Sequence, residues 1–409
     1  MHILLIHQSF VKPEEGGGTR HYEMCRHLVR FGHDISIISS QIIYLSGEKR
    51  SVSQEITDGI KVYYTKAYSQ IHKSILHRAI NALSFAISSF LTGLKLVEID
   101  VIWGTSPPLF QAFSSLILAK IKRVPYIFEV RDLWLDFSRE LGLVTNPITQ
   151  FLFKKIERFI YFHANAVVVN SPGFIPYIAK YIPKSRIKVF ANGVEINGFM
   201  QIDNNKVNTY IEKYKLKDKF VVLYAGNIGV ANDIDSILNA SRFLKFEFPE
   251  IVFVFFGGGL KEDKYKEICQ KDSLTNVHFF KSQPKKEMPF ILSMADVCLA
   301  TLRNIELFKT TYPNKVFDYM AAGRPTVLAI DGVIRDVIEK ANAGIFVEPG
   351  NSESLAAAIK NYFLNRYMIL EHGNNGRNYE RKYFDRQKIT RQFADFLENI
   401  RKKTKQDEA

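Results

Sequence analysis

The stretch Tyr312-Pro-Asn-Lys-Val-Phe-Asp-Tyr-Met-Ala-Ala-Gly-Arg-Pro325 carries the clearest structural signal in the chain. Pro313 near its start and Gly323 near its end predict a short helix with a defined beginning and end. The start of such a helix attracts anions, because unpaired backbone N–H groups and the positive end of the helix dipole lie there. Lys315 adds a cation in the first turn, and Asp318 adds an acceptor for hydroxyl groups on the same face. An amphipathic helix without a ligand is the alternative.

Short apolar runs alternate with helical patterns on either side of a break in mid-chain. The first half contains three amphipathic stretches, Arg20–Arg30, Leu109–Lys122 and Pro147–Phe162, between runs rich in β-branched residues. Near-continuous apolar strands that alternate with helices predict a parallel sheet covered on both faces. The strands expected in this half are Ile3–Ile6, Ile35–Ile38, Val62–Tyr64, Val101–Trp103, Tyr126–Phe128, Val167–Val169 and Ile187–Phe190.

The break follows Asn192-Gly193, where a charged, loop-like segment continues as far as Lys219. The strand–helix rhythm then begins again, and 409 residues exceed what one hydrophobic core usually supports. We therefore predict two doubly wound α/β domains, residues 1–195 and 196–383, followed by a C-terminal segment 384–409. The strands expected in the second domain are Phe220–Tyr224, Val252–Phe256, Val277–Phe280, Val297–Ala300, Thr326–Ala329 and Ile345–Val347, and the last helix is Gln387–Arg401.

Bulk composition narrows the class of protein. With 46% hydrophobic and 24% charged residues, the chain is an ordinary globular protein, and no apolar run reaches the roughly 18–20 residues of a membrane span. Cys25, Cys269 and Cys298 lack the spacing of metal or disulfide pairs, which favours reduced thiols in a cytosolic protein. The net charge of +13 calls for an anionic partner. Nucleic-acid-binding motifs are missing, so a membrane surface or a phosphorylated substrate is the expected partner.

Three further motifs follow predicted strands, where α/β domains bind ligands. Gly16-Gly-Gly-Thr-Arg20 follows the first strand, and its glycines let backbone approach a ligand, while Thr19 can cap the next helix. Glu129-Val-Arg-Asp-Leu-Trp134 places three charges directly after a buried strand, and Gly226-Asn-Ile-Gly229 ends the first strand of the second domain as a phosphate loop. A turn, a salt bridge and a strand end are the respective structural alternatives.

The segment Phe308–Pro325 resembles the donor-binding segment of retaining glycosyltransferases of family 4, most closely the bacterial branch of L-fucosamine transferases. The resemblance covers nearly the whole chain. The motifs occur in the order found in that family: the Gly-rich first loop, Glu129–Trp134, Asn192-Gly-Val194, Tyr224-Ala-Gly-Asn-Ile-Gly229 and Phe308–Pro325.

This resemblance implies the GT-B fold, in which two Rossmann-like domains face each other across a cleft and the last helix returns to the first domain. It implies a metal-independent enzyme without a cofactor that moves an N-acetylated or deoxy hexose from a UDP-sugar to a lipid-linked saccharide with retention of configuration. The expected context is O-antigen or capsule synthesis at the cytoplasmic face of the plasma membrane. A nucleotide-sugar 2-epimerase of the same fold and a non-enzymatic basic membrane- or nucleic-acid-binding protein are the alternatives.

The resemblance also assigns roles to residues. Asp132 is expected to orient the acceptor or take its proton, and Arg131 to stabilise the leaving diphosphate. Lys315 is expected at the diphosphate, Asp318 at the ribose, and the backbone near Lys281 at the nucleobase. The full set of expected donor-binding residues is Gly17, Gly18, Arg20, Gly226, Asn227, Lys281, Thr310, Thr311, Asn314, Lys315 and Asp318.

The chain departs from the wider family in two places. The family carries two glutamates eight positions apart, whereas this chain has Thr310 and Asp318, so a carboxylate is missing at the first position unless Glu306 replaces it. The Arg and Lys that usually follow the first strand of the second domain are replaced by Val230-Ala-Asn232. Backbone amides and Lys315 must therefore balance the diphosphate charge, with Arg20 as a candidate helper.

Two stretches of the first domain, Ile71–Leu96 and Phe151–Phe162, combine apolar residues with basic ones such as Lys154, Lys155 and Arg158. Helices of this kind usually cover a sheet. The alternative, favoured by the net charge, is that they lie on an anionic membrane surface.

Overall fold

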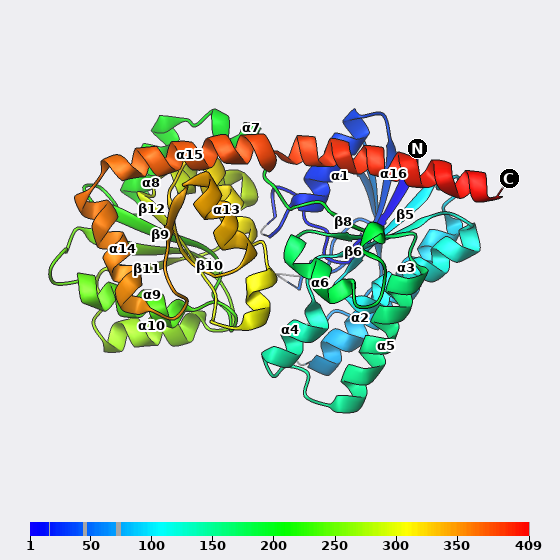
Figure 1. The fold of residues 1–409 in the computed structure, drawn as a ribbon, viewed down its shortest axis with the longest axis horizontal. Helices are drawn as coiled ribbons and strands as arrows, with labels where there is room; N and C mark the ends of the chain where they lie inside the picture. Colours follow the sequence, from blue (N-terminus) through cyan, green and yellow to red (C-terminus); the bar gives the residue numbers. More distant parts are fainter. Residues whose placement is uncertain (16, 44–46, 71–74, 409) are drawn as a thin grey trace. The chain divides into compact units, whose positions relative to one another are not determined.

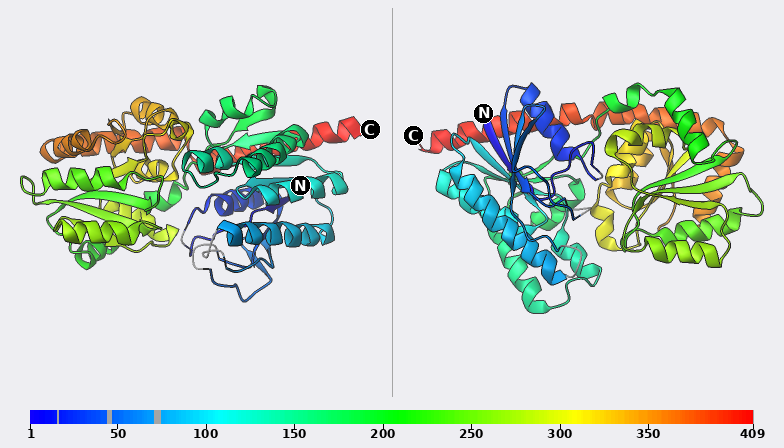
Figure 2. Two further views of the ribbon diagram at one scale, coloured as in Figure 1. Left: turned by 90° about the horizontal axis from the view of Figure 1, so that it is seen from below. Right: turned by 180° about the vertical axis from the view of Figure 1, so that it is seen from behind.

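The computed structural model describes residues 1–15, 17–43, 47–70 and 75–408. The chain divides into two compact units (Figures 1 and 2), each described separately below. The first consists mainly of residues 1–191 and the C-terminal segment from Arg386, and the second of Asn192–Asp385. Each unit contains a sheet of mainly parallel strands with helices on both faces, which confirms the predicted α/β class with two Rossmann-like domains.

The first unit is built on an eight-stranded sheet with the order β3-β4-β2-β1-β5-β6-β7-β8. All neighbouring strands pair in parallel except β3, which pairs antiparallel with β4 at the edge and was not predicted. Because the other strands are parallel, their carboxyl ends meet at one edge of the sheet. The strands are β1 His2–Ile6, β2 Asp34–Ser40, β3 Gln54–Thr57, β4 Ile60–Thr65, β5 Val101–Ser106, β6 Tyr126–Val130, β7 Ala166–Val169 and β8 Ile187–Val189.

Helices cover both faces of this sheet (Figure 1). On one face α1 packs against the C-terminal helix α16, and on the other α3 lies between α2 and α5. The ring of Phe393 on α16 lies 4.7 Å from that of Trp103 on β5 and 5.1 Å from that of Phe190, so α16 is part of the core of this unit. The helices are α1 Arg20–Arg30, α2 Ile75–Lys95, α3 Leu109–Lys122, α4 Trp134–Glu140, α5 Pro147–His163, α6 Ile175–Ile178 and α16 Arg386–Glu408, and η1 Pro172–Phe174 and η2 Lys184–Arg186 are short 3₁₀ turns.

The second unit contains a six-stranded parallel sheet with the order β11-β10-β9-β12-β13-β14. Its strands are β9 Phe220–Asn227, β10 Ile251–Gly258, β11 Val277–Phe280, β12 Val297–Thr301, β13 Thr326–Ala329 and β14 Gly344–Phe346. Its helices are α7 Asn197–Met200, α8 Asn204–Lys213, α9 Ile234–Leu244, α10 Glu262–Lys271, α11 Met288–Ser293, α12 Asn314–Ala321, α13 Val333–Ala341, α14 Ser352–Leu364 and α15 Tyr367–Tyr383, with 3₁₀ turns η3 Lys285–Glu287 and η4 Glu306–Thr310.

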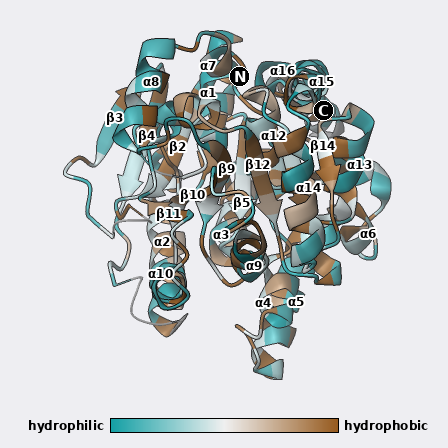
Figure 3. Ribbon diagram, turned by 90° about the vertical axis from the view of Figure 1, so that its left-hand side faces the viewer, coloured by the Kyte–Doolittle hydropathy of each residue, from teal (hydrophilic) through white to brown (hydrophobic). Residues whose placement is uncertain are grey.

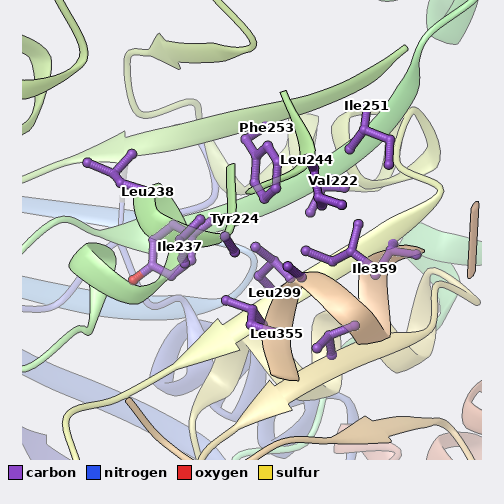
Figure 4. Close-up of a cluster of buried hydrophobic side chains, with 14 of the residues drawn as sticks. Val222, Tyr224, Ile237, Leu238, Leu244, Ile251, Phe253, Leu299, Leu355 and Ile359 are labelled. Carbon is purple, nitrogen blue, oxygen red and sulfur yellow. The ribbon is translucent and has the colours of Figure 1, made fainter. Parts of the chain in front are cut away.

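The hydrophobic core of the second unit explains why its strands are apolar. The strands are hydrophobic along most of their length (Figure 3), and alternate side chains of β9, β10 and β12 pack against α9, α10 and α14. Figure 4 shows this cluster, with Val222, Phe253 and Leu299 facing Ile237 of α9 and Leu355 of α14. Each of these five side chains is fully buried, which contributes on the order of 1.5–3 kcal/mol per residue.

One sequence-based expectation for this unit was wrong. The charged segment before Lys219 contains the helix α8, whose charges lie on its exposed side around buried Val207. At the other end of the first strands of this unit, β10 continues through Gly258 and pairs with Gly226 and Asn227 of β9. A side chain at Gly257 would overlap with the carbonyl oxygen of Gly226, so the glycine allows the two strands to lie close together.

The packing of α16 yields a stability prediction. Phe393→Ala should lower the free energy of unfolding of the first unit by about 3–5 kcal/mol, because a buried ring is lost and a cavity remains. Tryptophan fluorescence during urea unfolding reports on this unit, since both tryptophans of the chain, Trp103 and Trp134, belong to it. Phe246→Ala is the control, because Phe246 is 86% exposed. Equal unfolding curves for the two variants would contradict the assignment of α16 to this core.

Candidate active site

The ammonium group of Lys315 is the most unusual feature of the second unit. Lys315 lies in the first turn of α12, and its Nζ is buried without a hydrogen-bond partner among the described residues. The group lies 3.7 Å from the centre of the Tyr224 ring, close enough for a cation–π contact. Burial lowers the pKa of Lys315 from its usual value to about 7. A buried ammonium without an anion is costly, so this arrangement indicates a site for an anionic ligand.

Gly226 makes room for this lysine. Its φ of +140° is one that L residues rarely adopt, and a Cβ at this position would lie 3.1 Å from Nζ and 3.2 Å from Cε of Lys315. Glycine therefore allows the lysine side chain to pass over the end of β9 toward Tyr224. The structure thus brings together two predicted donor-binding positions, Gly226 and Lys315, and the next residue, Asn227, ends β9 beside them.

The position of α12 is fixed from its buried side. Tyr319 is fully buried, and its hydroxyl lies 2.9 Å from the Ala225 backbone N–H and 3.2 Å from the Leu299 carbonyl oxygen. These contacts tie α12 to the carboxyl ends of β9 and β12. Gly323 has a φ of +66° just beyond the helix, as predicted for its stop. The start of α12 and the end of β9 therefore lie together at one corner of the second unit, which is the candidate anion site.

Asp318 has a cationic partner that the sequence did not reveal. Nζ of Lys285, in η3, lies 2.6 Å from both carboxylate oxygens of Asp318. The two side chains keep 21% and 16% of their surface exposed, so the pair lies at the edge of the site rather than in the core. A carboxylate has about four lone-pair positions, and the pair leaves some of them for ligand hydroxyls. Lys285 follows Pro284 after β11, a position that carries no recognisable motif.

Two other predicted donor-binding residues, Thr310 and Thr311, direct their hydroxyl groups to nearby backbone. The Thr310 hydroxyl donates to the Leu307 carbonyl oxygen over 2.6 Å, and the Thr311 hydroxyl to that of Phe308 over 2.8 Å, so both hydroxyls stabilise η4. Asn314 and Lys281 are exposed.

Glu306, the suggested replacement for the carboxylate missing at position 310, begins η4. Its side chain is 81% exposed and pairs with Lys309 over 2.8 Å. Thr310, at the position of the family's first glutamate, is 8% exposed.

In the first unit, Arg131 is held by backbone oxygens at the carboxyl edge of the sheet. Nη2 donates to the Pro107 carbonyl oxygen over 2.6 Å and Nε to that of Ser106 over 3.3 Å. Nη1 lies 3.3 Å from Nε2 of His7. Carbonyl oxygens do not neutralise a guanidinium, so its positive charge remains available to an anionic or polar substrate group.

Asp132, next to Arg131, is exposed, and no hydrogen bond to its carboxylate is found among the described residues. Partial loss of hydration raises its pKa to about 6, while the neighbouring Arg131 charge acts in the opposite direction. The carboxylate can therefore accept a hydrogen bond from a substrate hydroxyl at neutral pH. Gly17 and Gly18 are also exposed, and Gly16 lies outside the described residues.

The expected phosphate role of Arg20 does not fit its placement. Arg20 is 5% exposed, forms a buried ion pair with Glu129 and donates to the Phe190 carbonyl oxygen over 3.1 Å. Glu129 belongs to β6 rather than to the loop after it, and it also accepts hydrogen bonds from Trp103 and from His21. Burial opposes ionisation of Glu129, but the Arg20 charge, together with His21 and the Arg131 charge, outweighs it and holds the pKa of this carboxyl at about 2. Arg20 thus anchors α1 to the sheet.

The predicted helix cap at Thr19 was also wrong. The Thr19 hydroxyl donates to Glu23 instead of accepting from the start of α1. Glu23 in turn pairs with Arg386 at the beginning of α16.

The described part of the chain contains no group of three or more His, Cys, Asp or Glu side chains placed to hold a metal ion. None of the helices in this part is long and apolar enough to span a membrane.

Comparison with known proteins covers both units. Residues 206–383 match the family described as glycosyl transferases group 1, and residues 15–193 match the glycosyl transferase 4-like domain. WcaI of Escherichia coli (strain K12), named for glycosyl transfer in colanic acid biosynthesis, is 24% identical and covers 96% of this chain and 98% of its own. WbjE of Pseudomonas aeruginosa, named as a glycosyltransferase, is 24% identical over 68% of this chain and 70% of its own. The crystal structure of HepE of Anabaena in complex with UDP aligns with a TM-score of 0.72 at 17% identity, covering 98% of this chain and 100% of HepE.

The lowered pKa of Lys315 predicts proton uptake on binding of a nucleoside diphosphate. At pH 8 the amine is mostly neutral in the free protein, and an adjacent diphosphate favours its ammonium form. Binding should therefore take up a proton, and the affinity for UDP should fall as the pH rises above 7. The phosphates do not contribute in this range, because their second pKa is about 6. Calorimetry of UDP binding at pH 8 in HEPES and in Tris measures the uptake. Lys315→Met should abolish it, and uptake that persists in this variant would show that another group titrates.

Proposed function

We propose that the chain, whose two halves match the glycosyl transferases group 1 family and the glycosyl transferase 4-like domain, transfers a sugar from a UDP-sugar to a lipid-linked saccharide with retention of configuration. The observation that carries this proposal is the buried ammonium of Lys315 at the junction of α12 and β9, without a partner among the described residues. A diphosphate would supply the missing anion. The name of the relative WcaI, which refers to colanic acid biosynthesis, supports a role in surface polysaccharide synthesis, and the UDP bound to HepE supports a uridine nucleotide.

The donor binds to the second unit in this proposal. Its diphosphate lies against Lys315, Gly226 and the first N–H groups of α12, and its ribose hydroxyls reach Asp318. Departure of the diphosphate leaves negative charge on its oxygens, which Lys315 and the helix start stabilise in a site of low polarity. Because Lys315 and the helix dipole stabilise this charge, the proposed reaction is independent of a metal ion. The sugar is an N-acetylated or deoxy hexose.

The acceptor binds to the first unit in this proposal. Asp132 accepts a hydrogen bond from the attacking hydroxyl and orients it, and Arg131 binds an oxygen of the departing diphosphate. The hydroxyl attacks the anomeric carbon from the side on which the diphosphate leaves, and the leaving phosphate oxygen takes the proton of the hydroxyl. The C–O bond to the acceptor forms as the C–O bond to the phosphate breaks, so configuration is retained without a covalent intermediate on the protein.

We also propose that the first unit binds an anionic membrane surface at the cytoplasmic face, where a lipid-linked acceptor is found. The helix α2 carries a stripe of exposed apolar side chains at spacings of three and four residues, which places them on one face. On α5 Phe151 and Phe162 are 58% and 66% exposed. The stripe on α2 consists of Leu76, Ile80, Leu83, Ile87, Leu91 and Leu94, which are 39–67% exposed.

The basic residues of α5 contribute unequally to this surface. Lys154 was expected to face the membrane, but it lies 3.1 Å from Asp136 and 2.8 Å from Glu157, which neutralise it. Lys155 and Arg158 lie over the rings of Phe151 and Tyr181. Each basic residue near an anionic bilayer contributes about 1 kcal/mol to binding. With Lys154 neutralised, the electrostatic gain comes from two residues of α5 instead of three.

The donor site is tested by Lys315→Met, which keeps the volume of the side chain but removes its charge. Loss of a charge-assisted contact worth about 1.5–3 kcal/mol should weaken UDP binding by roughly 10- to 150-fold. Lys286→Met is the matched control, because Lys286 is exposed and lies beside the Asp318-bound Lys285 rather than in the site. Mass spectrometry with a panel of UDP-, GDP- and ADP-sugars and lipid-diphosphate-linked acceptors then identifies the donor. Equal UDP affinity in both variants would refute the proposed diphosphate site.

The membrane surface is tested by Leu83→Glu combined with Ile87→Glu. Both side chains are about half exposed, so the fold should survive, while two charges on the apolar stripe should oppose contact with lipid. The wild-type protein should sediment with anionic vesicles at low salt and be released as salt rises, and the double variant should remain in the supernatant. The control is Phe246→Glu in the second unit. Sedimentation of the double variant like the wild type would exclude α2 as the contact.

A further inference from the structure

His7 is a buried residue to which none of the sequence motifs assigns a role. It follows β1 directly, at the carboxyl edge of the first sheet, and its backbone N–H still donates to the Ile38 carbonyl oxygen over 3.0 Å. The side chain is 2% exposed and packs edge-on against His21, with ring centres 4.3 Å apart. Burial, assisted by the nearby charges of His21, Arg131 and Arg20, holds the pKa of His7 well below its usual value. The imidazole is therefore neutral at physiological pH.

Arg131 determines which nitrogen of His7 carries the proton. Its Nη1 lies 3.3 Å from Nε2 of His7, and a guanidinium can only donate hydrogen bonds. Nε2 must therefore accept, and in a neutral imidazole the proton is then on Nδ1. The guanidinium itself is held in place by the carbonyl oxygens of Ser106 and Pro107. Its orientation relative to His7 is thus set by backbone.

The Nδ1–H group of His7 has no acceptor among the described residues. Its neighbour His21 differs, since Nε2 of that ring lies 2.7 Å from the Glu129 carboxylate. A buried donor without an acceptor destabilises the fold, and such groups are rare unless a ligand or an ordered water completes them. An oxygen atom of a ligand or of an ordered water would complete this donor, which belongs to the same ring that contacts Arg131.

We propose that the Nδ1–H of His7 binds a hydroxyl oxygen of the acceptor saccharide, beside Arg131. This inference rests on the proposed function, since it assumes that the acceptor binds to the first unit. A neutral donor suits an uncharged hydroxyl, whereas the phosphate oxygens are served by the cations Arg131 and Lys315. His7 thereby orients the acceptor sugar relative to Asp132, which receives the attacking hydroxyl. Its role is recognition of the acceptor, and it takes no part in donor binding.

Two substitutions separate the two nitrogens of His7. In His7→Asn the side-chain amide reaches the position of Nδ1 and can supply an N–H there, but it does not reach Arg131. In His7→Gln the amide oxygen reaches the position of Nε2 and can accept from Arg131, but no N–H remains at the Nδ1 position. If the Nδ1–H binds the acceptor, His7→Gln should raise the KM for a lipid-diphosphate-linked monosaccharide at least tenfold. His7→Asn should change that KM less than threefold.

UDP affinity, measured by calorimetry for the same variants, separates this proposal from the proposed function. It should stay within twofold of wild type in both, whereas failure of UDP to bind the wild-type protein would refute the donor site. Equal acceptor KM in the wild type and both variants would overturn the role of His7 and assign its N–H to a water molecule. Loss confined to His7→Asn would also overturn it, because His7 would then act only by positioning Arg131.

The tautomer of His7 can be measured without any substrate. Long-range ¹H–¹⁵N correlation spectra of the free protein, with the His7 signals identified by their absence in His7→Asn, distinguish a protonated Nδ1 from a protonated Nε2. We expect the proton on Nδ1 and a shift of this nitrogen on addition of the acceptor. A proton on Nε2 in the free protein would overturn the proposal.

Discussion

The Lys315 ammonium, buried over the Tyr224 ring, is the constraint around which the second unit is arranged. A charge in this position loses most of its hydration, and a single aromatic face returns only part of that free energy. The unit accommodates it through a glycine at position 226 and through α12, whose Tyr319 is tied to β9 and β12. The free protein therefore holds a binding group in a costly state, which an incoming diphosphate would relieve.

This view explains why the site can lack the Arg and Lys that usually follow the first strand of this domain. Val230 and Ala231 stand there, and the charge instead comes from within the helix. Lys285 provides a second example, because it orients the Asp318 carboxylate, which the sequence places alone on α12. Lys315 is distant in sequence from the end of β9, and Lys285 is distant in sequence from Asp318. In both cases the packing of secondary structure brings the cation into place.

Local patterns in the sequence predicted most helices and strands. They were much less informative about which side chains contact each other between elements that are distant in sequence. The helices Arg20–Arg30 and Leu109–Lys122 were predicted with the observed bounds, since their apolar periodicity is a property of the segment alone. The helix α8 was missed, because a half-exposed helix of charged residues lacks a strong apolar face. Arg20 and Lys154 were both expected to meet ligands or lipid, but each is paired with a carboxylate, Arg20 with Glu129 on another element.

The central claim is that Nζ of Lys315 binds the diphosphate of the donor. A crystal structure of the protein with UDP should show Nζ of Lys315 about 2.7–2.9 Å from a diphosphate oxygen, the usual length of a charge-assisted hydrogen bond. The ribose hydroxyls should lie against Asp318, with Lys285 still bound to that carboxylate. A UDP molecule whose diphosphate lies elsewhere, with Lys315 unchanged over the Tyr224 ring, would contradict the account.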